Sequence, residues 1–142
     1  MIKVVLDANV FVSTLLKSHS KQATVFQLGK EGKVLLVSSD EILSEVKAVL
    51  LYPKLKKLHG RTTGEIDEFI ERATRVSFIV PGKIKIQRIK DDPKDNKYLS
   101  AAVEGRADFI VSGDHHLKDL KIFQGIRILG PASFLELMTK LR

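Results

Sequence analysis

The sequence predicts an α/β fold in which helices cover both faces of a mostly parallel sheet. Short apolar runs alternate with segments of helical periodicity, a pattern typical of strand–helix–strand units. The 142 residues are the length of one domain, so we expect residues 1–142 to fold as a single unit. Hydrophobic residues make up 44% of the chain and charged residues 29%, which is ordinary globular usage and argues against global disorder.

The N-terminal half is expected to hold two strands and several helices. Ser38 and Glu41 have the spacing of a capping box, which predicts a helix start, and Pro53 is expected to end or kink that helix. Thr62 and Glu65 repeat the spacing and predict a second capped helix. The expected elements are strands at 3–6 and 34–37, and helices at 10–17, 22–30, after residue 38 and after residue 62.

The C-terminal half continues the alternation. Asp92 and Pro93 are a good N-cap and first helical residue, and Gly105 is expected to end the helix that they begin. Segments 78–80 and 84–89 both resemble strands, and the sequence does not decide which of them joins the sheet. The remaining expected elements are strands at 109–111 and 126–129 and a closing helix at 131–141.

Positive charge is concentrated in two stretches. The net charge is +7, and residues 46–64 and 72–90 contain no acidic residue. Such stretches suit a polyanion, although lysines on solvated helix faces would look the same. The aromatic residues, all Phe or Tyr, belong to apolar patterns rather than to runs of basic residues, so we expect contacts to a nucleic-acid backbone rather than base stacking. The candidate RNA-backbone residues are Lys54, Lys56, Lys57 and Arg61.

Several classes of protein are excluded. The chain has no cysteine, which rules out disulfide scaffolds, thiolate zinc sites and cysteine nucleophiles and fits an expected cytoplasmic location. It has no apolar run of about 18 residues, so no membrane span is expected. It also lacks a glycine-rich phosphate loop and a Gly-x-Ser-x-Gly elbow, so nucleotide-driven and serine-hydrolase chemistry have no support.

Two acidic residues follow apolar strands. Asp7 comes directly after the first strand, and Asp114 follows the strand at 109–111. In a parallel α/β sheet the carboxyl ends of the strands open into the binding crevice, so both side chains are expected to face it. Each could instead simply cap the helix that follows.

Two more acidic residues lie on or beside buried helix faces. Asp95 shares a helical face with Leu99 and Ala102, which places it within the apolar stripe. A capping role explains an acid in the first turn, and explains its inward direction less well. Glu45 borders the buried stripe of its helix and could equally reach water.

Together the four acids predict a metal site. Carboxylates gathered in one crevice repel one another unless a cation neutralises them. Oxygen ligands without cysteine favour Mg²⁺ or Mn²⁺ over zinc. Such an ion can orient a water, promote its deprotonation and stabilise charge during phosphoryl displacement. The basic stretches would then hold a polyanion that the metal site cleaves.

At this point the sequence resembles the PIN-domain family of metal-dependent ribonucleases, and within it the branch of VapC-like toxin components of toxin–antitoxin modules. The resemblance extends over nearly the whole chain. It rests on the order and spacing of short motifs rather than on any one of them. These are LDANV at 6–10, SSDEILSEV at 38–46, DDPKDN at 91–96, two alanines at 101–102 and ADFIVSGD at 107–114.

The resemblance implies a three-layer α/β/α sandwich with a central parallel sheet. It implies RNA as substrate, one or two Mg²⁺ or Mn²⁺ ions, a homodimer and, for a toxin, an antitoxin partner. The family's acidic residues fall on the four acids already singled out, with Asn9 and Ser112 as polar neighbours of the site and Asp92 as a helix cap. Asp7, Asp95 and Asp114 would be the main ligands, and Glu45 a further ligand or the group that orients the water.

Two other readings remain open at this stage. A non-catalytic RNA- or protein-binding module would need only the basic stretches, with the acids acting as helix caps. A haloacid-dehalogenase-like phosphatase also has an aspartate after its first strand, but it needs a second acid where this chain has Asn9.

Overall fold

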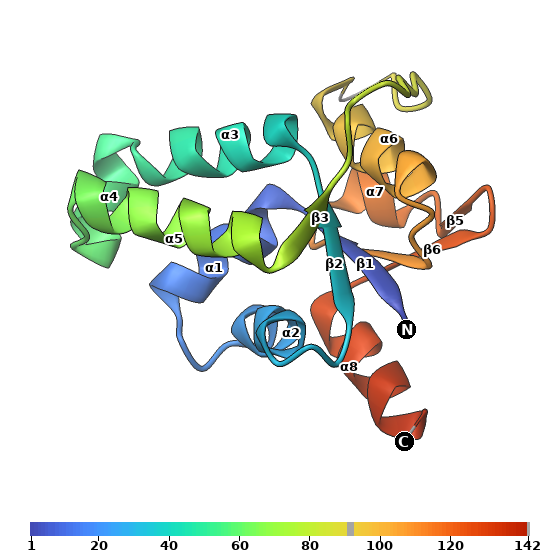
Figure 1. The fold of residues 1–142 in the computed structure, drawn as a ribbon, viewed down its shortest axis with the longest axis horizontal. Coiled ribbons are helices and arrows are strands. Elements are labelled where there is room, and N and C mark those ends of the chain that lie inside the picture. The colour runs from blue at the N-terminus through green and yellow to red at the C-terminus, as the bar shows by residue number, and fades with distance from the viewer. Residues whose placement is uncertain (91–92, 142) are drawn as a thin grey trace.

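A single sheet forms the centre of the molecule, with helices on both of its faces (Figure 1). The computed structural model describes residues 1–90 and 93–141, and of residue 116 the backbone alone. Within these residues six strands pair in the order β3-β2-β1-β4-β6-β5, and all pairs are parallel except β5 with β6. The strands are β1 Lys3–Leu6, β2 Leu35–Ser38, β3 Ser77–Ile79, β4 Phe109–Val111, β5 Ile122–Phe123 and β6 Ile126–Leu129.

Helices form a layer on each face of this sheet. Neighbouring residues of β2 point in opposite directions: Leu36 lies against Gly29 of α2, and Val37 lies against Gly105 at the end of α6. Figure 1 shows α3 and α5 on one side of the sheet and α6 and α7 on the other. The helices are α1 Ala8–Leu16, α2 Lys21–Lys30, α3 Asp40–Leu50, α4 Pro53–His59, α5 Thr63–Arg75, α6 Asn96–Glu104, α7 His115–Lys118 and α8 Pro131–Lys140.

The predicted α/β sandwich is therefore confirmed, and its core follows from the central strands. Val4, Val5 and Leu6 of β1 are each at most 1% exposed, because helices cover both faces of a central parallel strand. The antiparallel strand β5 at one edge is an addition that the sequence reading missed. None of the helices within the described ranges is both long and apolar enough to cross a membrane.

The two predicted capping boxes have different outcomes. The Thr62 hydroxyl accepts a hydrogen bond from the Glu65 N–H (3.1 Å), and the Glu65 carboxylate accepts one from the Thr62 N–H (3.0 Å), as predicted. The prediction for Ser38 is wrong by one residue. Ser38 pairs with Ile79 of β3 and stays in the sheet, so Ser39 becomes the N-cap of α3.

Other boundaries also differ from the sequence prediction. Pro53 does not merely end a helix: α3 stops at Leu50, and Pro53 is the first residue of the short helix α4, which was not predicted. Of the two strand-like segments, 78–80 supplies β3, whereas 84–89 forms no strand. Asp92 lies outside the described residues; after it, a 3-10 turn over Pro93–Asp95 leads into α6.

We expect Gly105→Ala to lower the stability of the fold. A Cβ atom at Gly105 would lie 2.4 Å from Cγ1 of Val37 and 3.1 Å from the Ala101 carbonyl oxygen, so α6 would have to shift away from the sheet. The expected loss in the free energy of unfolding is about 1–3 kcal/mol, measured by urea denaturation. Gly64→Ala, at an exposed position of α5, is the control and should be neutral or stabilising, since the nearest contact of the added Cβ would be Thr62 Oγ1 at 3.8 Å. Equal stability of the two variants would contradict close packing at Gly105.

Candidate metal centre

Asp7 lies at the carboxyl end of β1 and is the N-cap of α1. Its Oδ1 accepts a hydrogen bond from the Val10 N–H at 2.9 Å, which satisfies a free donor of the first helical turn. The residue is only 2% exposed. The cap uses one carboxylate oxygen, so the capping and site readings of Asp7 are compatible.

Ser112 brings a second strand end to Asp7. Leu6 pairs with Val111 in the β1–β4 register, so Asp7 and Ser112 leave their strands side by side. The buried Ser112 hydroxyl donates a hydrogen bond to Oδ2 of Asp7 and accepts one from the Asp114 N–H (2.9 Å). This hydroxyl therefore fixes Asp7 and the Asp114 backbone relative to each other. Asp114 also accepts a hydrogen bond from the Leu117 N–H (3.3 Å) and so caps α7.

The electrostatics of this pair favour a cation. Burial raises the pKa of Asp7, and the hydrogen bonds from Ser112 and Val10 only partly oppose that rise. The negative charge of Asp114 raises the pKa of Asp7 further. A positive ion between the two carboxylates would relieve both costs, because it would offset the lost hydration and the repulsion.

Glu45 is joined to this region through α6. One oxygen of the half-buried Glu45 carboxylate accepts a hydrogen bond from the Tyr98 hydroxyl at 2.9 Å, and the other forms an ion pair with Nζ of Lys97 at 2.7 Å. The Tyr98 hydroxyl in turn accepts a hydrogen bond from the Ala8 N–H at 3.0 Å. Tyr98 thus links Glu45 of α3 to the residue that follows Asp7.

Two predicted site residues occupy contrasting environments. Asp95 is 8% exposed and ends the 3-10 turn before α6. The start of α6 lies near the carboxyl end of β1, since the Tyr98 hydroxyl contacts Ala8 there. Asn9 lies in the first turn of α1 and is exposed.

The side chains are not gathered into a ready-made cage. Within the described residues, no group of three or more histidine, aspartate or glutamate side chains is close enough together to hold a metal ion. Glu45 is engaged by Lys97 and Tyr98 instead. Asp7 and Asp114 nevertheless offer carboxylate oxygens, and Asp7 is buried. Such oxygen ligands suit a hard cation such as Mg²⁺ or Mn²⁺.

The candidate RNA-backbone residues lie away from this region. Lys54, Lys56 and Lys57 are on α4, and Arg61 follows that helix. Figure 1 shows α4 at the end of the molecule opposite α6 and α7. The structure therefore does not bring this basic cluster to the Asp7–Asp114 pair.

Tyr98 and Lys97 are polar residues that the sequence analysis did not select. Tyr98 fits the apolar stripe of α6 and is 2% exposed, so it reads as an ordinary core residue. A buried tyrosine needs a partner for its hydroxyl, and this was the one available signal. Lys97 gives no signal in the sequence, because its partner Glu45 is on another helix.

Comparison with known proteins agrees with this architecture. Residues 3–116 match the family model described as the PIN domain, so the chain belongs to the PIN-domain family. This confirms the resemblance seen in the sequence and leaves the phosphatase reading without support.

The particular relatives include an archaeal protein and a solved bacterial complex. The uncharacterized protein MJ1680 of Methanocaldococcus jannaschii is 32% identical over 120 residues, which is 84% of this chain and 76% of that protein. VapBC2 from Rickettsia felis, solved bound to a DNA fragment from its promoter, superposes with a TM-score of 0.56 at 15% identity. That match covers 89% of this chain and 97% of the other, and it shows a shared fold.

Proposed function

We propose that the chain is a divalent-metal-dependent endoribonuclease and the toxin component of a toxin–antitoxin module. The observation that carries the nuclease proposal is the buried Asp7 carboxylate, held beside Asp114 at the ends of two parallel strands. Membership of the PIN-domain family supports the same reading. The fold shared with VapBC2 supports the toxin assignment and an antitoxin partner.

Each acidic residue has a role in this proposal. Asp7, Asp95 and Asp114 would hold Mg²⁺ or Mn²⁺, with Glu45 as a further ligand or as the group that orients the attacking water. When bound, the ion would promote deprotonation of that water and stabilise charge on the phosphodiester. The products would carry a 3′-hydroxyl and a 5′-phosphate.

The chain's own hydrogen bonds would hold these groups in place. Val10 N–H and the Ser112 hydroxyl each take one oxygen of Asp7, so its carboxylate plane is fixed before RNA binds. Asn9 would act as a second polar neighbour of the ligands. For Glu45 to act as a ligand, its carboxylate oxygen would have to leave Lys97 and bind the ion instead.

The direct test is cleavage of single-stranded RNA by Asp95→Asn. We expect at least about a 100-fold loss, because the amide removes a negative ligand while keeping the volume of the side chain. A chelator should abolish cleavage by the unaltered protein, and added Mg²⁺ or Mn²⁺ should restore it. Asp67→Asn is the matched control: Asp67 is an exposed acid that pairs with Lys47, so cleavage should be unchanged. Cleavage that persists in chelator would refute the metal mechanism.

A non-catalytic RNA- or protein-binding module is the second candidate. The observation in its favour is that, among the described residues, no three acids lie close enough together to hold a metal ion, and Glu45 forms an ion pair with Lys97. Such a module would bind RNA and take up no divalent ion. Calorimetric titration with Mn²⁺ separates the two candidates, since the nuclease should bind the ion through Asp7.

A further inference from the structure

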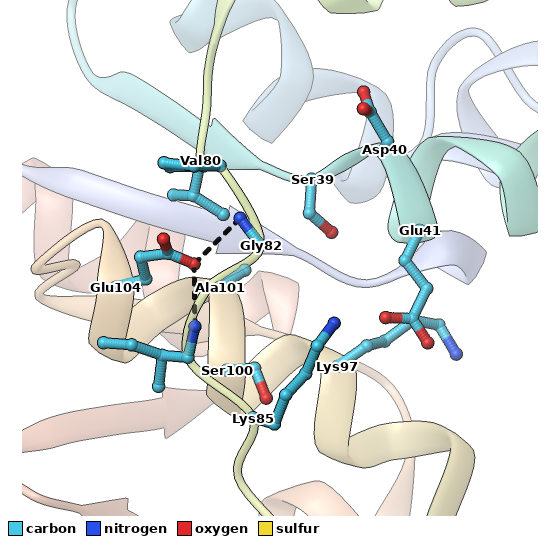
Figure 2. Close-up of a pocket in the computed structure, with 12 residues that line it drawn as sticks. Ser39, Asp40, Glu41, Val80, Gly82, Lys85, Lys97, Ser100, Ala101 and Glu104 are labelled. Carbon is cyan, nitrogen blue, oxygen red and sulfur yellow. Dashed lines mark hydrogen bonds between the residues drawn. The ribbon is translucent and has the colours of Figure 1, made fainter.

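Polar side chains along one face of α6 form hydrogen bonds with the backbone of residues 82–90, a segment that we call the basic strap. Near its start, the carboxylate of Glu104 accepts hydrogen bonds from successive backbone N–H groups. These belong to Gly82 (3.1 Å), Lys83 (3.1 Å) and Ile84 (3.4 Å), and Figure 2 shows the first of them. The Glu104 carboxylate therefore binds the backbone of the basic strap near its start.

The same face of α6 holds the rest of the strap. The Ser100 hydroxyl accepts a hydrogen bond from the Ile86 N–H at 2.9 Å. The Asn96 amide oxygen accepts from the N–H groups of Arg88 (3.0 Å) and Ile89 (2.7 Å), and its NH₂ group donates to the Ile89 carbonyl (3.0 Å). Asn96, Ser100 and Glu104 are four residues apart, so they share one helical face. Their side chains satisfy this backbone in place of a neighbouring strand.

The exposed side of the strap is strongly basic. Ile89 is buried and Ile86 is half-buried, so these two apolar side chains turn toward the protein. The cationic side chains of the strap are exposed, and the segment has no acid. They are Lys83, Lys85, Arg88 and Lys90.

Two adjoining cavities lie between the strap, α6 and the start of α3. Their volumes are about 250 Å³ and about 540 Å³. They share four lining residues, so we treat them as one surface, the strap groove; Figure 2 shows the smaller of the two. The shared residues are Glu41, Lys85, Lys97 and Ser100.

The strap groove contacts the candidate metal centre through the Lys97–Glu45 ion pair. Lys97 lines both cavities, and its side chain is only 7% exposed. Its Nζ lies 2.7 Å from the Glu45 carboxylate, which is the far end of the network that Tyr98 connects to Ala8. A polyanion lying along the groove would thus lie beside the Lys97–Glu45 ion pair, at the edge of the proposed metal centre.

We propose that the strap groove, rather than the α4 cluster, holds the phosphate backbone of the RNA substrate; this inference rests on the proposed nuclease function. Its cations are fixed on an ordered backbone, which lowers the cost of ordering them on binding. No aromatic residue is found among the described residues that line the groove, so it would contact phosphates rather than stack bases. Three acidic residues on its wall, Asp40, Glu41 and Glu104, oppose phosphate.

Binding measured without cleavage tests this proposal. Fluorescence anisotropy of a labelled single-stranded RNA in chelator would compare Lys85→Gln/Lys90→Gln, which changes two cations that line the groove, with the control Lys54→Gln/Lys57→Gln, which removes the same charge. The strap variant should lose at least about tenfold in affinity and about 1.4 units of salt slope, since each phosphate contact on a single strand contributes about 0.7. The control should change by less than about twofold.

The other outcomes overturn the proposal. Equal losses in the two variants would indicate diffuse attraction, and a larger loss in the control would place RNA on α4. Intact strap-dependent binding without any cleavage in Mg²⁺ or Mn²⁺ would refute the nuclease function alone.

A variant with the opposite sign guards against misfolding as an explanation. Glu41→Gln removes an acid that lines both cavities, so RNA affinity should rise by about twofold or more at low salt. A misfolded protein would not bind more tightly. Unchanged or weaker binding by Glu41→Gln would contradict the location of the backbone in the strap groove.

Discussion

Asp7→Asn is expected to abolish RNA cleavage without unfolding the protein. The loss should be at least about 100-fold, because the variant removes the most buried negative ligand of the proposed centre. Asparagine keeps an oxygen that can accept the Val10 N–H, and it is as good an N-cap as aspartate. Activity and stability should therefore move independently.

The pH dependence of stability shows in which direction Asp7→Asn changes the free energy of unfolding. Burial raises the pKa of Asp7 in the folded state, so the folded protein binds that proton more tightly than the unfolded chain does. The corresponding stability is present below the ordinary aspartate pKa and is lost as the pH rises through the raised value. The Asp7→Asn variant has no carboxyl group at this position, so it does not lose this stability as the pH rises. Its free energy of unfolding, relative to that of the unaltered protein, should therefore be higher at about pH 7 than at about pH 4.

Thermal denaturation with and without Mn²⁺ completes this test. A bound ion stabilises the folded state by mass action, so Mn²⁺ should raise the Tm of the unaltered protein more than that of Asp7→Asn. A variant that cleaves RNA normally, or that gains as much from Mn²⁺, would contradict the role of Asp7 as a ligand.

Tyr98→Phe is expected to lower both stability and cleavage. Burial raises the pKa of the Tyr98 phenol, so it stays protonated and donates to Glu45 while accepting the Ala8 N–H. Phenylalanine leaves that buried N–H without its partner, which should cost about 1–3 kcal/mol in the free energy of unfolding. Cleavage should fall about 10–100-fold, since Tyr98 acts as a positioning residue for Glu45.

The measurement must separate positioning from instability. Urea denaturation gives the stability, and cleavage is then measured well below the Tm across a range of pH. A positioning role predicts an altered pH profile and weaker Mn²⁺ binding, which a merely less stable fold would not show. Tyr52→Phe is the control, because Tyr52 is 58% exposed and should change neither quantity. A Tyr98→Phe variant with lower stability but an unaltered profile would contradict the role.

Local signals predicted the central part of the fold. The buried strand β1 and the Thr62 capping box depend on residues that are close in sequence, so apolar runs and cap spacing were sufficient. The strand β5 was missed because it has only two residues and lies between Lys121 and Gln124, which take the left-handed conformation without being glycine. The segment at 84–89 has the composition of a strand, but α6 side chains satisfy its backbone.

The candidate site was predictable where strand ends determine it. Asp7 and Ser112 meet because parallel strands end at the same edge of the sheet. The link from Glu45 to Lys97 and Tyr98 was not predictable, since it depends on how α3 and α6 are rotated against each other. The position of the α4 lysines, far from the acids, was not predictable for a similar reason. The sequence shows that the segment is basic but not where its helix lies in the fold.

Both edges of the sheet are short, and this bears on self-association. The outer strands are Ser77–Ile79 at one edge and Ile122–Phe123 at the other. A strand from a second copy would find few backbone groups to pair with at either edge, so continuous growth of the sheet would gain little. A homodimer of this chain would have to draw its affinity from helix surfaces, and single substitutions there would control it more than any change in the strands.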